Sequence, residues 1–164
     1  MHPDELTAFI AKYRTKGIVV DTNLLLVWLV GRYDLTYLSR FKRTSAYGTE
    51  DFFTLAAILD SFSTIVTTPN ILTEVSNLSR RIPPKYFQEF RKQVRIFDEK
   101  YVPSQSVLST KDFERFGLTD LVIAALSKKR YLVVTADLDL WLLLQKTGVD
   151  AINFNHIRAM LRIG

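Results

Sequence analysis

The sequence predicts an α/β protein built on a mostly parallel sheet. Short runs of branched apolar residues, such as Ile18-Val19-Val20, alternate along the chain with longer segments that have helical periodicity. Several of these runs lead directly into a helix-start signal, as Asp21 does after the first run. This alternation is typical of folds in which helices pack on a parallel sheet.

The first third of the chain contains one expected strand between two expected helices. Residues 4–14 place apolar side chains on one helical face, and Gly17 ends that helix. The strand at 17–20 leads into an apolar helix at 23–30. The stretch from 31 to 50 is polar and basic, and we expect it to be an irregular, flexible loop.

The middle of the chain continues the alternation. Residues 51–62 are apolar on most sides and predict a buried helix, followed by a short strand at 65–68. Pro69 suits the first turn of the next helix. A further helix is expected to begin at Pro83-Pro84 and to run to about Lys100.

The last third predicts two more strands, each followed by a helix. The clearest strand of the whole sequence is Tyr131-Leu132-Val133-Val134-Thr135. In chain order we expect a loop or short strand at 101–109, a helix at 121–129, a strand at 131–135, a helix at 137–146, a strand at 149–154 and a helix at 155–163.

Length and composition indicate one domain over residues 1–164, with 1–16 as a helical extension before the first strand. The chain has no cysteine, and only His2 and His156 could supply imidazole, so a metal would be held by oxygen ligands, as Mg²⁺ or Mn²⁺ are. The net charge of +5 favours anionic partners, nucleic acid first. The longest apolar run, Leu24 to Val30, is too short to span a bilayer, so we expect a cytoplasmic protein with no membrane partner.

Four acids stand close to strand ends or helix starts: Asp21, Glu74, Asp120 and Asp137. Each has a simpler explanation when taken alone. Asp21, Asp120 and Asp137 suit the cap or the first turn of a helix, and Glu74 suits a solvated position early in a helix. For Asp21 alone, capping and function explain the residue equally well.

Together the four acids predict a metal site. The carboxyl ends of parallel strands and the starts of the following helices meet at one edge of a sheet. Four carboxylates gathered there would repel one another and destabilise the fold. Two divalent cations would offset four negative charges. We therefore expect Mg²⁺ or Mn²⁺ at this edge.

The same residues resemble a known family. Val20-Asp21-Thr22-Asn23, Thr73-Glu74-Val75, Thr119-Asp120 and Thr135-Ala136-Asp137 are similar, in order and spacing, to the four acidic motifs of PIN-domain nucleases. The resemblance covers roughly residues 17–155. It implies an α/β/α sandwich with a central parallel sheet, Mg²⁺ or Mn²⁺ at the acids, and cleavage of RNA. Many members are VapC-type toxins of toxin–antitoxin pairs, which implies a protein inhibitor as partner.

The resemblance also implies individual roles. Asp21, Glu74, Asp120 and Asp137 would be the catalytic, metal-binding acids, with Asn23 supporting the first acid and Thr135 lying beside the last. Asp139 is an additional candidate ligand, although in a continuous helix it would point roughly 200° away from Asp137. The implied reaction is metal-assisted hydrolysis of a phosphodiester bond.

Basic residues supply candidate phosphate contacts, although each one alone is better explained as part of a solvated surface. The candidates are Arg40, Lys42, Arg43, Arg80 and Arg81. The apolar helix at 51–62 could supply the surface of a homodimer.

Two other functions compete with the nuclease. The first is a catalytically inactive PIN-like scaffold that binds RNA or protein, which would have no reason to keep all four acids. The second is a phosphotransfer enzyme with an aspartyl nucleophile. Such sites usually need a second aspartate two residues after the first, and this chain has Asn23 there.

Overall fold

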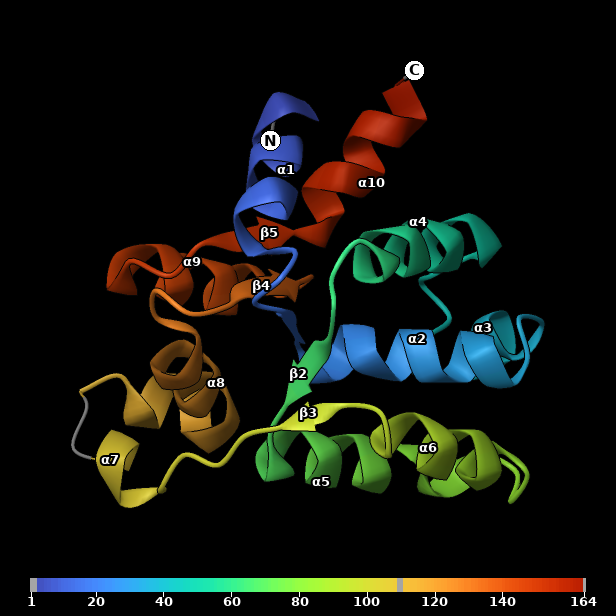
Figure 1. Ribbon diagram of the computed structural model, residues 1–164. Helices are drawn as coiled ribbons and strands as arrows, with labels where there is room; N and C mark the ends of the chain where they lie inside the picture. The colour runs from blue at the N-terminus through green and yellow to red at the C-terminus, as the bar shows by residue number, and fades with distance from the viewer. Residues whose placement is uncertain (1–2, 109–110, 164) are drawn as a thin grey trace.

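The computed structural model describes residues 3–108 and 111–163, so His2 lies outside the described residues. Five parallel strands form one sheet in the order β3-β2-β1-β4-β5. In Figure 1 the strands are stacked from β3 at the bottom to β5 at the top, with α8 and α9 on the left and α2 and α4 on the right. The protein is thus an α/β/α sandwich, as the sequence predicts. The strands are β1 (Ile18–Val20), β2 (Ile65–Thr67), β3 (Asp98–Glu99), β4 (Leu132–Thr135) and β5 (Ala151–Asn153).

The helices fill the intervals between these strands. They are α1 (Pro3–Tyr13), α2 (Thr22–Tyr33), α3 (Tyr37–Arg40), α4 (Thr49–Asp60), α5 (Pro69–Leu78), the 3₁₀ turn η1 (Ser79–Arg81), α6 (Tyr86–Val94), α7 (Gln105–Leu108), α8 (Phe113–Ser127), α9 (Leu138–Thr147) and α10 (Phe154–Ile163). None of the described helices is long and apolar enough to cross a membrane.

The centre of the sheet is covered on both faces. All three residues of β1 are buried, and the strand is central, since it pairs with β2 on one side and with β4 on the other. A central parallel strand of this kind carries apolar residues without alternation. Helix α2 is buried almost all round, with nine of its 12 residues buried. It packs so closely on α4 that a Cβ on Gly31 would lie 2.2 Å from the Phe52 ring.

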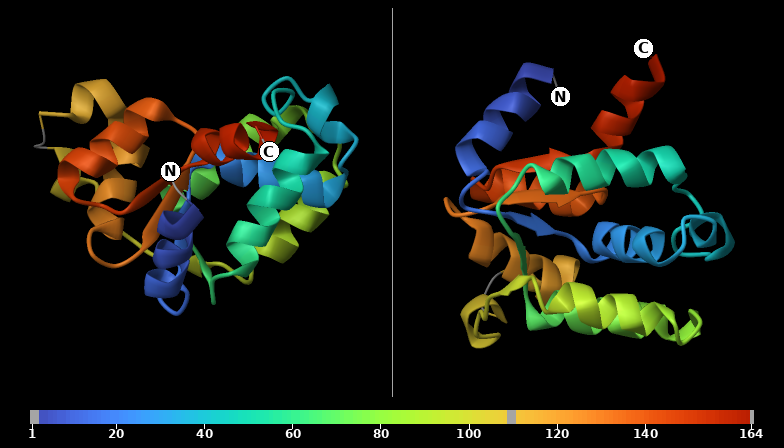
Figure 2. Two further views of the ribbon diagram at one scale, coloured as in Figure 1. Left: turned by 90° about the horizontal axis from the view of Figure 1, so that it is seen from above. Right: turned by 45° about the vertical axis from the view of Figure 1, so that its right-hand side comes forward.

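The first and the last helix lie beyond β5. Helices α1 and α10 stand past that edge of the sheet in Figure 1, and the right-hand view of Figure 2 shows them separated from each other. Lys12 and Tyr13 hold α1 there, because the Lys12 Nζ lies 2.6 Å and the Tyr13 hydroxyl 2.8 Å from the Asp150 carboxylate, just before β5. The expected helix before the first strand is thus tied to the last strand.

The expectation of an irregular loop at 31–50 is partly wrong. Helix α2 continues to Tyr33, α3 follows, and α4 begins at Thr49. Leu38 and Phe41 are buried and anchor this segment to the body of the protein. Two scattered apolar residues give no clear period in the sequence, so only their packing reveals them.

The expectation for residues 84–109 is also partly wrong. Helix α6 stops at Val94, and Asp98–Glu99 forms the edge strand β3, which pairs with Val66 and Thr67 of β2. A two-residue charged strand has no hydrophobic signal, and its partner strand alone defines it. The expected loop or short strand at 101–109 contains α7, and its last residue, Ser109, lies outside the described residues.

Helix α8 begins earlier than the expected helix at 121–129. It starts at Phe113 and contains a break at Gly117, whose φ of 74° is the left-handed conformation that glycine adopts readily. The break starts a second helical segment just after Gly117. Asp120 therefore lies in the first turn of that segment, in line with the interpretation of this acid as a first-turn residue.

Candidate functional site

Asp21 lies directly after β1 and is only 3% exposed. One carboxylate oxygen accepts a hydrogen bond of 2.7 Å from the Leu24 N–H, so Asp21 is the N-cap of α2. The other oxygen accepts from the Thr135 hydroxyl and, at 3.2 Å, from the Ala136 N–H. The residue therefore caps a helix and also joins the ends of two neighbouring strands, so the capping role does not exclude a functional one.

Asp137 lies on the other side of Thr135. Its carboxylate caps α9 by accepting from the N–H groups of Asp139 and Leu140 at 2.8 and 3.1 Å. Its own N–H donates to the Thr135 hydroxyl oxygen at 2.9 Å. The Thr135 hydroxyl thus contacts both the carboxylate of the first acid of the predicted site and the backbone N–H of the last.

Glu74 forms a second connection, between three helices. It lies on α5 and is exposed. One carboxylate oxygen accepts a hydrogen bond of 2.9 Å from the Thr22 hydroxyl at the start of α2, and the other accepts from the Thr119 hydroxyl on α8. The acid of α5 is therefore held against the residues that neighbour Asp21 and Asp120 in sequence.

Asp120 is the acid without a partner. It is half-buried on α8, and no described residue forms a hydrogen bond or an ion pair with its carboxylate. Burial and the negative charges of Asp137, Asp21 and Glu74 raise the pKa of Asp120 to about 7. The charged groups acting on Asp120 are therefore the other three predicted acids.

The pKa of Asp21 is raised as well. Its burial is the largest cause, and the charge of Asp137 adds to it, while the hydrogen bonds from Thr135, Leu24 and Ala136 act in the opposite direction. The tertiary structure therefore brings the four acids within electrostatic reach of one another. We call Asp21, Glu74, Asp120 and Asp137 the acid cluster.

The acid cluster fits a divalent cation in charge and in donor chemistry, since it offers carboxylate oxygens that face no cation. Its side-chain placement is less complete. Within residues 3–108 and 111–163, no three acidic or histidine side chains are arranged so that they could hold one metal ion. Three of the four carboxylates instead accept hydrogen bonds from hydroxyl or backbone N–H groups of the protein. Binding a metal would require some of these bonds to be exchanged for metal contacts.

The side chains of two residues expected at the site form no hydrogen bond with the acids in the described part of the chain. Asn23 is exposed, and no hydrogen bond joins it to Asp21 in the described part of the chain. Asp139 lies in the first turn of α9 and pairs with Arg115 at 2.8 Å, where both side chains are about two-thirds exposed. Asp139 as a metal ligand stays a prediction, and the support expected from Asn23 comes from Thr135.

Two supporting hydroxyls, those of Thr22 and Thr119, were not predicted from the sequence. Each precedes or follows an acid of the cluster by one residue, and each donates to Glu74. Their position beside the motif acids was the available signal. Nothing in the sequence, however, indicates that both would turn towards an acid on a different helix.

The basic candidates divide into two groups. Lys42, Arg43, Arg80 and Arg81 come together around one hollow of about 710 Å³, which Phe41, Asn77 and Leu78 also line. Arg40 does not line this hollow. Two segments almost 40 residues apart in sequence thus form a single basic surface, which we call the basic hollow.

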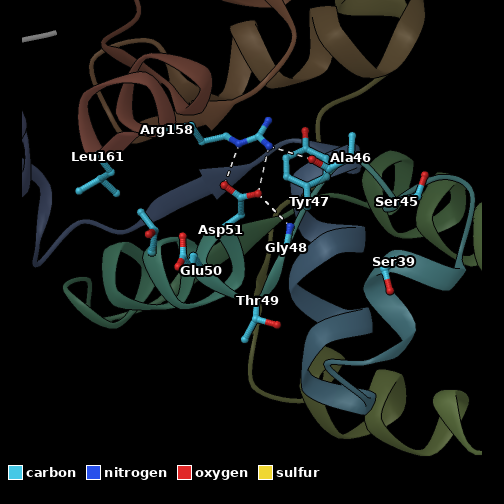
Figure 3. Close-up of a pocket in the computed structure, with 11 residues that line it drawn as sticks. Ser39, Ser45, Ala46, Tyr47, Gly48, Thr49, Glu50, Asp51, Arg158 and Leu161 are labelled. Carbon is cyan, nitrogen blue, oxygen red and sulfur yellow. Dashed lines mark hydrogen bonds and ion pairs between the residues drawn. The ribbon is translucent and has the colours of Figure 1, made fainter. Parts of the chain in front are cut away.

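A second hollow, of about 390 Å³, contains an ion pair (Figure 3). Arg158 of α10 forms two bonds with the Asp51 carboxylate, at 2.8 and 3.0 Å, and its guanidinium lies 4.8 Å from the centre of the Tyr47 ring. Burial, then the negative charge of Asp21, raises the pKa of Tyr47, against the opposing effect of Arg158. This hollow is therefore within electrostatic reach of the acid cluster.

No protein-family model matches the chain, and no curated protein matches it. The site is therefore interpreted from its own residues and from the resemblance in its motifs.

Proposed function

We propose that the protein is a metal-dependent nuclease of the PIN type, which hydrolyses RNA phosphodiester bonds at the acid cluster with Mg²⁺ or Mn²⁺. The observation that carries this proposal is the Asp120 carboxylate, which is half-buried, has its pKa raised by the charges of three other acids, and forms no ion pair with any cation of the described residues. Structural carboxylates are usually paired or solvated. A bound cation would compensate the charge of an acid in such a place.

Each acid of the cluster has a distinct role in this proposal. Asp21 and Asp120 are the principal ligands, Asp137 completes the site, and Glu74 orients water near the phosphate. A bound divalent cation would lower the pKa of a water molecule and neutralise charge that develops on the phosphate. The Thr135 hydroxyl holds the Asp21 carboxylate in place, as partners of metal ligands commonly do.

The narrower parts of the proposal rest on the resemblance of the motifs. These parts are RNA as the substrate, a VapC-type toxin role and an antitoxin as protein inhibitor. The homodimer rests on the apolar helix at 51–62, and the cytoplasmic location on the short length of the longest apolar run, Leu24 to Val30. The phosphotransfer alternative has less support. Such sites usually need a second aspartate two residues after the nucleophile, and Asn23 stands at that position.

A catalytically inactive scaffold remains the second candidate, because one observation favours it. No three side chains of the described acids are arranged to hold one metal ion. A scaffold needs only the hydrogen bonds that the acids already make. The nuclease needs a rearrangement of carboxylates when the metal binds.

The test is a cleavage assay on a mixed-sequence RNA with Mg²⁺, with Mn²⁺ and with a chelator. We expect cleavage only with metal, and a loss of about a thousand-fold in Asp120→Asn, on the order of 4 kcal/mol in activation free energy. Asp60→Asn is the matched control, because Asp60 is an exposed acid at the end of α4, outside the cluster. Full activity of Asp120→Asn, or no cleavage by the wild type with either metal, would favour the scaffold.

A further inference from the structure

The basic hollow is formed by two segments that the fold brings together. Lys42 and Arg43 lie in the turns after α3, and Arg80 and Arg81 lie in η1, just past the end of α5. All four side chains are exposed. They surround a concave space of about 710 Å³, so their charges act on a common volume.

The charges of the basic hollow are not compensated within the described part of the chain. No acid there pairs with any of the four cations, and Arg80 donates only to the Asn77 side-chain oxygen, at 2.9 Å. Elsewhere on the surface Arg32 pairs with Glu89 and Arg115 pairs with Asp139. Four clustered cations without acids produce a positive potential that attracts polyanions.

The basic hollow lies next to the acid cluster along α5. Glu74 of the cluster is three and four residues before Asn77 and Leu78, which line the hollow. Residues at these separations share one face of a helix, and four residues rise only about 6 Å. A chain of phosphates that follows this face would therefore pass from one region to the other.

We propose that the basic hollow binds the phosphates of a single-stranded nucleic acid on one side of the phosphate that lies at the acid cluster. This inference rests on the proposed nuclease function and extends it to the form of the substrate. The acid cluster repels a polyanion until metal binds, so attraction has to come from a neighbouring surface. Positively charged grooves supply that attraction in other single-strand binding proteins.

The depth of the acids selects a single strand over a duplex. Asp21 is buried and Asp120 is half-buried, so a phosphate that contacts them has to lie deeper than the surrounding protein surface. A single strand can bend its backbone inwards. A duplex is stiff over tens of base pairs and would have to be deformed to do the same.

The test measures binding without catalysis. A fluorescein-labelled 12-nucleotide oligouridylate is titrated with protein in EDTA, at several salt concentrations, and followed by anisotropy. We expect the Arg43→Gln/Arg81→Gln variant to bind at least ten-fold more weakly. The slope of log affinity against log salt should fall by about 1.4, as expected for the loss of two phosphate contacts on a single strand.

The matched control is Lys128→Gln/Arg130→Gln, which removes two exposed cations from the turn after α8. It should bind within two-fold of the wild type. Equal weakening by both variants, or tighter binding of a duplex of the same length, would overturn the inference. Equal binding of an oligothymidylate supports it, because phosphate contacts do not distinguish the two sugars. If the double variant melts at a lower temperature than the wild type, Lys42→Gln/Arg80→Gln replaces it, with the same expected loss.

The inference and the proposed function fail in different ways. Metal-independent oligouridylate binding that depends on Arg43 and Arg81, without any cleavage, keeps the inference and rejects the nuclease. Metal-dependent cleavage that is unchanged in Arg43→Gln/Arg81→Gln, with unchanged binding, keeps the nuclease and rejects the basic hollow as its substrate surface.

Discussion

Two half-buried acids of this protein have opposite surroundings. Asp51 accepts two bonds from Arg158 and one of 2.9 Å from the Gly48 N–H, and its side chain is 12% exposed. Asp120 is also half-buried, but the charges of three other acids raise its pKa and no described residue forms a hydrogen bond or an ion pair with its carboxylate. The two carboxylates are thus similar in burial and differ in how their charge is compensated.

The difference shows which kind of buried acid points to a ligand. Burial alone does not point to a ligand, since the ion pair with Arg158 already compensates the charge of the Asp51 carboxylate. An uncompensated charge does, because the fold keeps it at a cost in stability. Each of the following experiments changes one side of this comparison.

The largest expected effect on stability is at the compensated acid. Arg158→Met keeps much of the side-chain volume but leaves the Asp51 carboxylate half-buried without its cation. We expect the free energy of unfolding to fall by about 3 kcal/mol, as for other pairs broken from one side. Urea denaturation measures it. A change below about 0.5 kcal/mol would mean that the Asp51–Arg158 pair behaves as a solvated surface pair.

Asp120→Asn should instead raise the free energy of unfolding of the metal-free protein. The pKa of Asp120 is raised from 3.8 to about 7, and each unit is worth about 1.4 kcal/mol. Partial exposure of Asp120 reduces this energy. We expect the free energy of unfolding to rise by about 2 kcal/mol near pH 8, measured by urea denaturation in EDTA. Protonated Asp120 contributes stability that is complete below pH 3.8 and lost as the pH rises through about 7, so the gain should vanish near pH 4. Destabilisation at pH 8 would show that Asp120 has a stabilising partner.

Divalent metal should stabilise the wild type in a way that depends on Asp120. A ligand at ten times its dissociation constant adds about 1.4 kcal/mol to the free energy of unfolding. We expect MgCl₂ or MnCl₂ to raise the melting temperature of the wild type and to have little effect on Asp120→Asn. NaCl of equal ionic strength is the control. An equal rise in both proteins would indicate a metal effect outside the acid cluster.

The smallest effect is expected at the support of Glu74. Thr22→Val removes one hydroxyl that donates to Glu74, while the Thr119 hydroxyl still donates to it. We expect a loss of about 0.5–1 kcal/mol in thermal or urea denaturation. A loss above 2 kcal/mol would show that the connection between α2 and α5 depends mainly on this one bond. Thr15→Val, at an exposed threonine whose hydroxyl forms no hydrogen bond within the described part of the chain, is the control.

Much of the fold was predictable because its signals are local. The runs at β1, β2, β4 and β5 are apolar enough to predict strands, and Pro69 and Asp137 predict the helix starts that the structure has. The same strand and helix-start signals predicted that Asp21 and Asp137 would each lie between a strand and a helix. Parallel strands place their carboxyl ends at one edge, so acids that follow them approach one another.

The sequence by itself determined the α/β class, the central strands and the edge of the sheet at which Asp21 and Asp137 lie, because these depend on periodicity and on helix caps within a few residues. Only the tertiary structure decided which groups meet across the chain. It placed Thr135 between two acids, put Thr22 and Thr119 on Glu74, made an edge strand of Asp98–Glu99, and joined Arg43 to Arg81 around one hollow. These are contacts between distant segments, and their partners are fixed by packing of the whole core and not by the local pattern around any one residue.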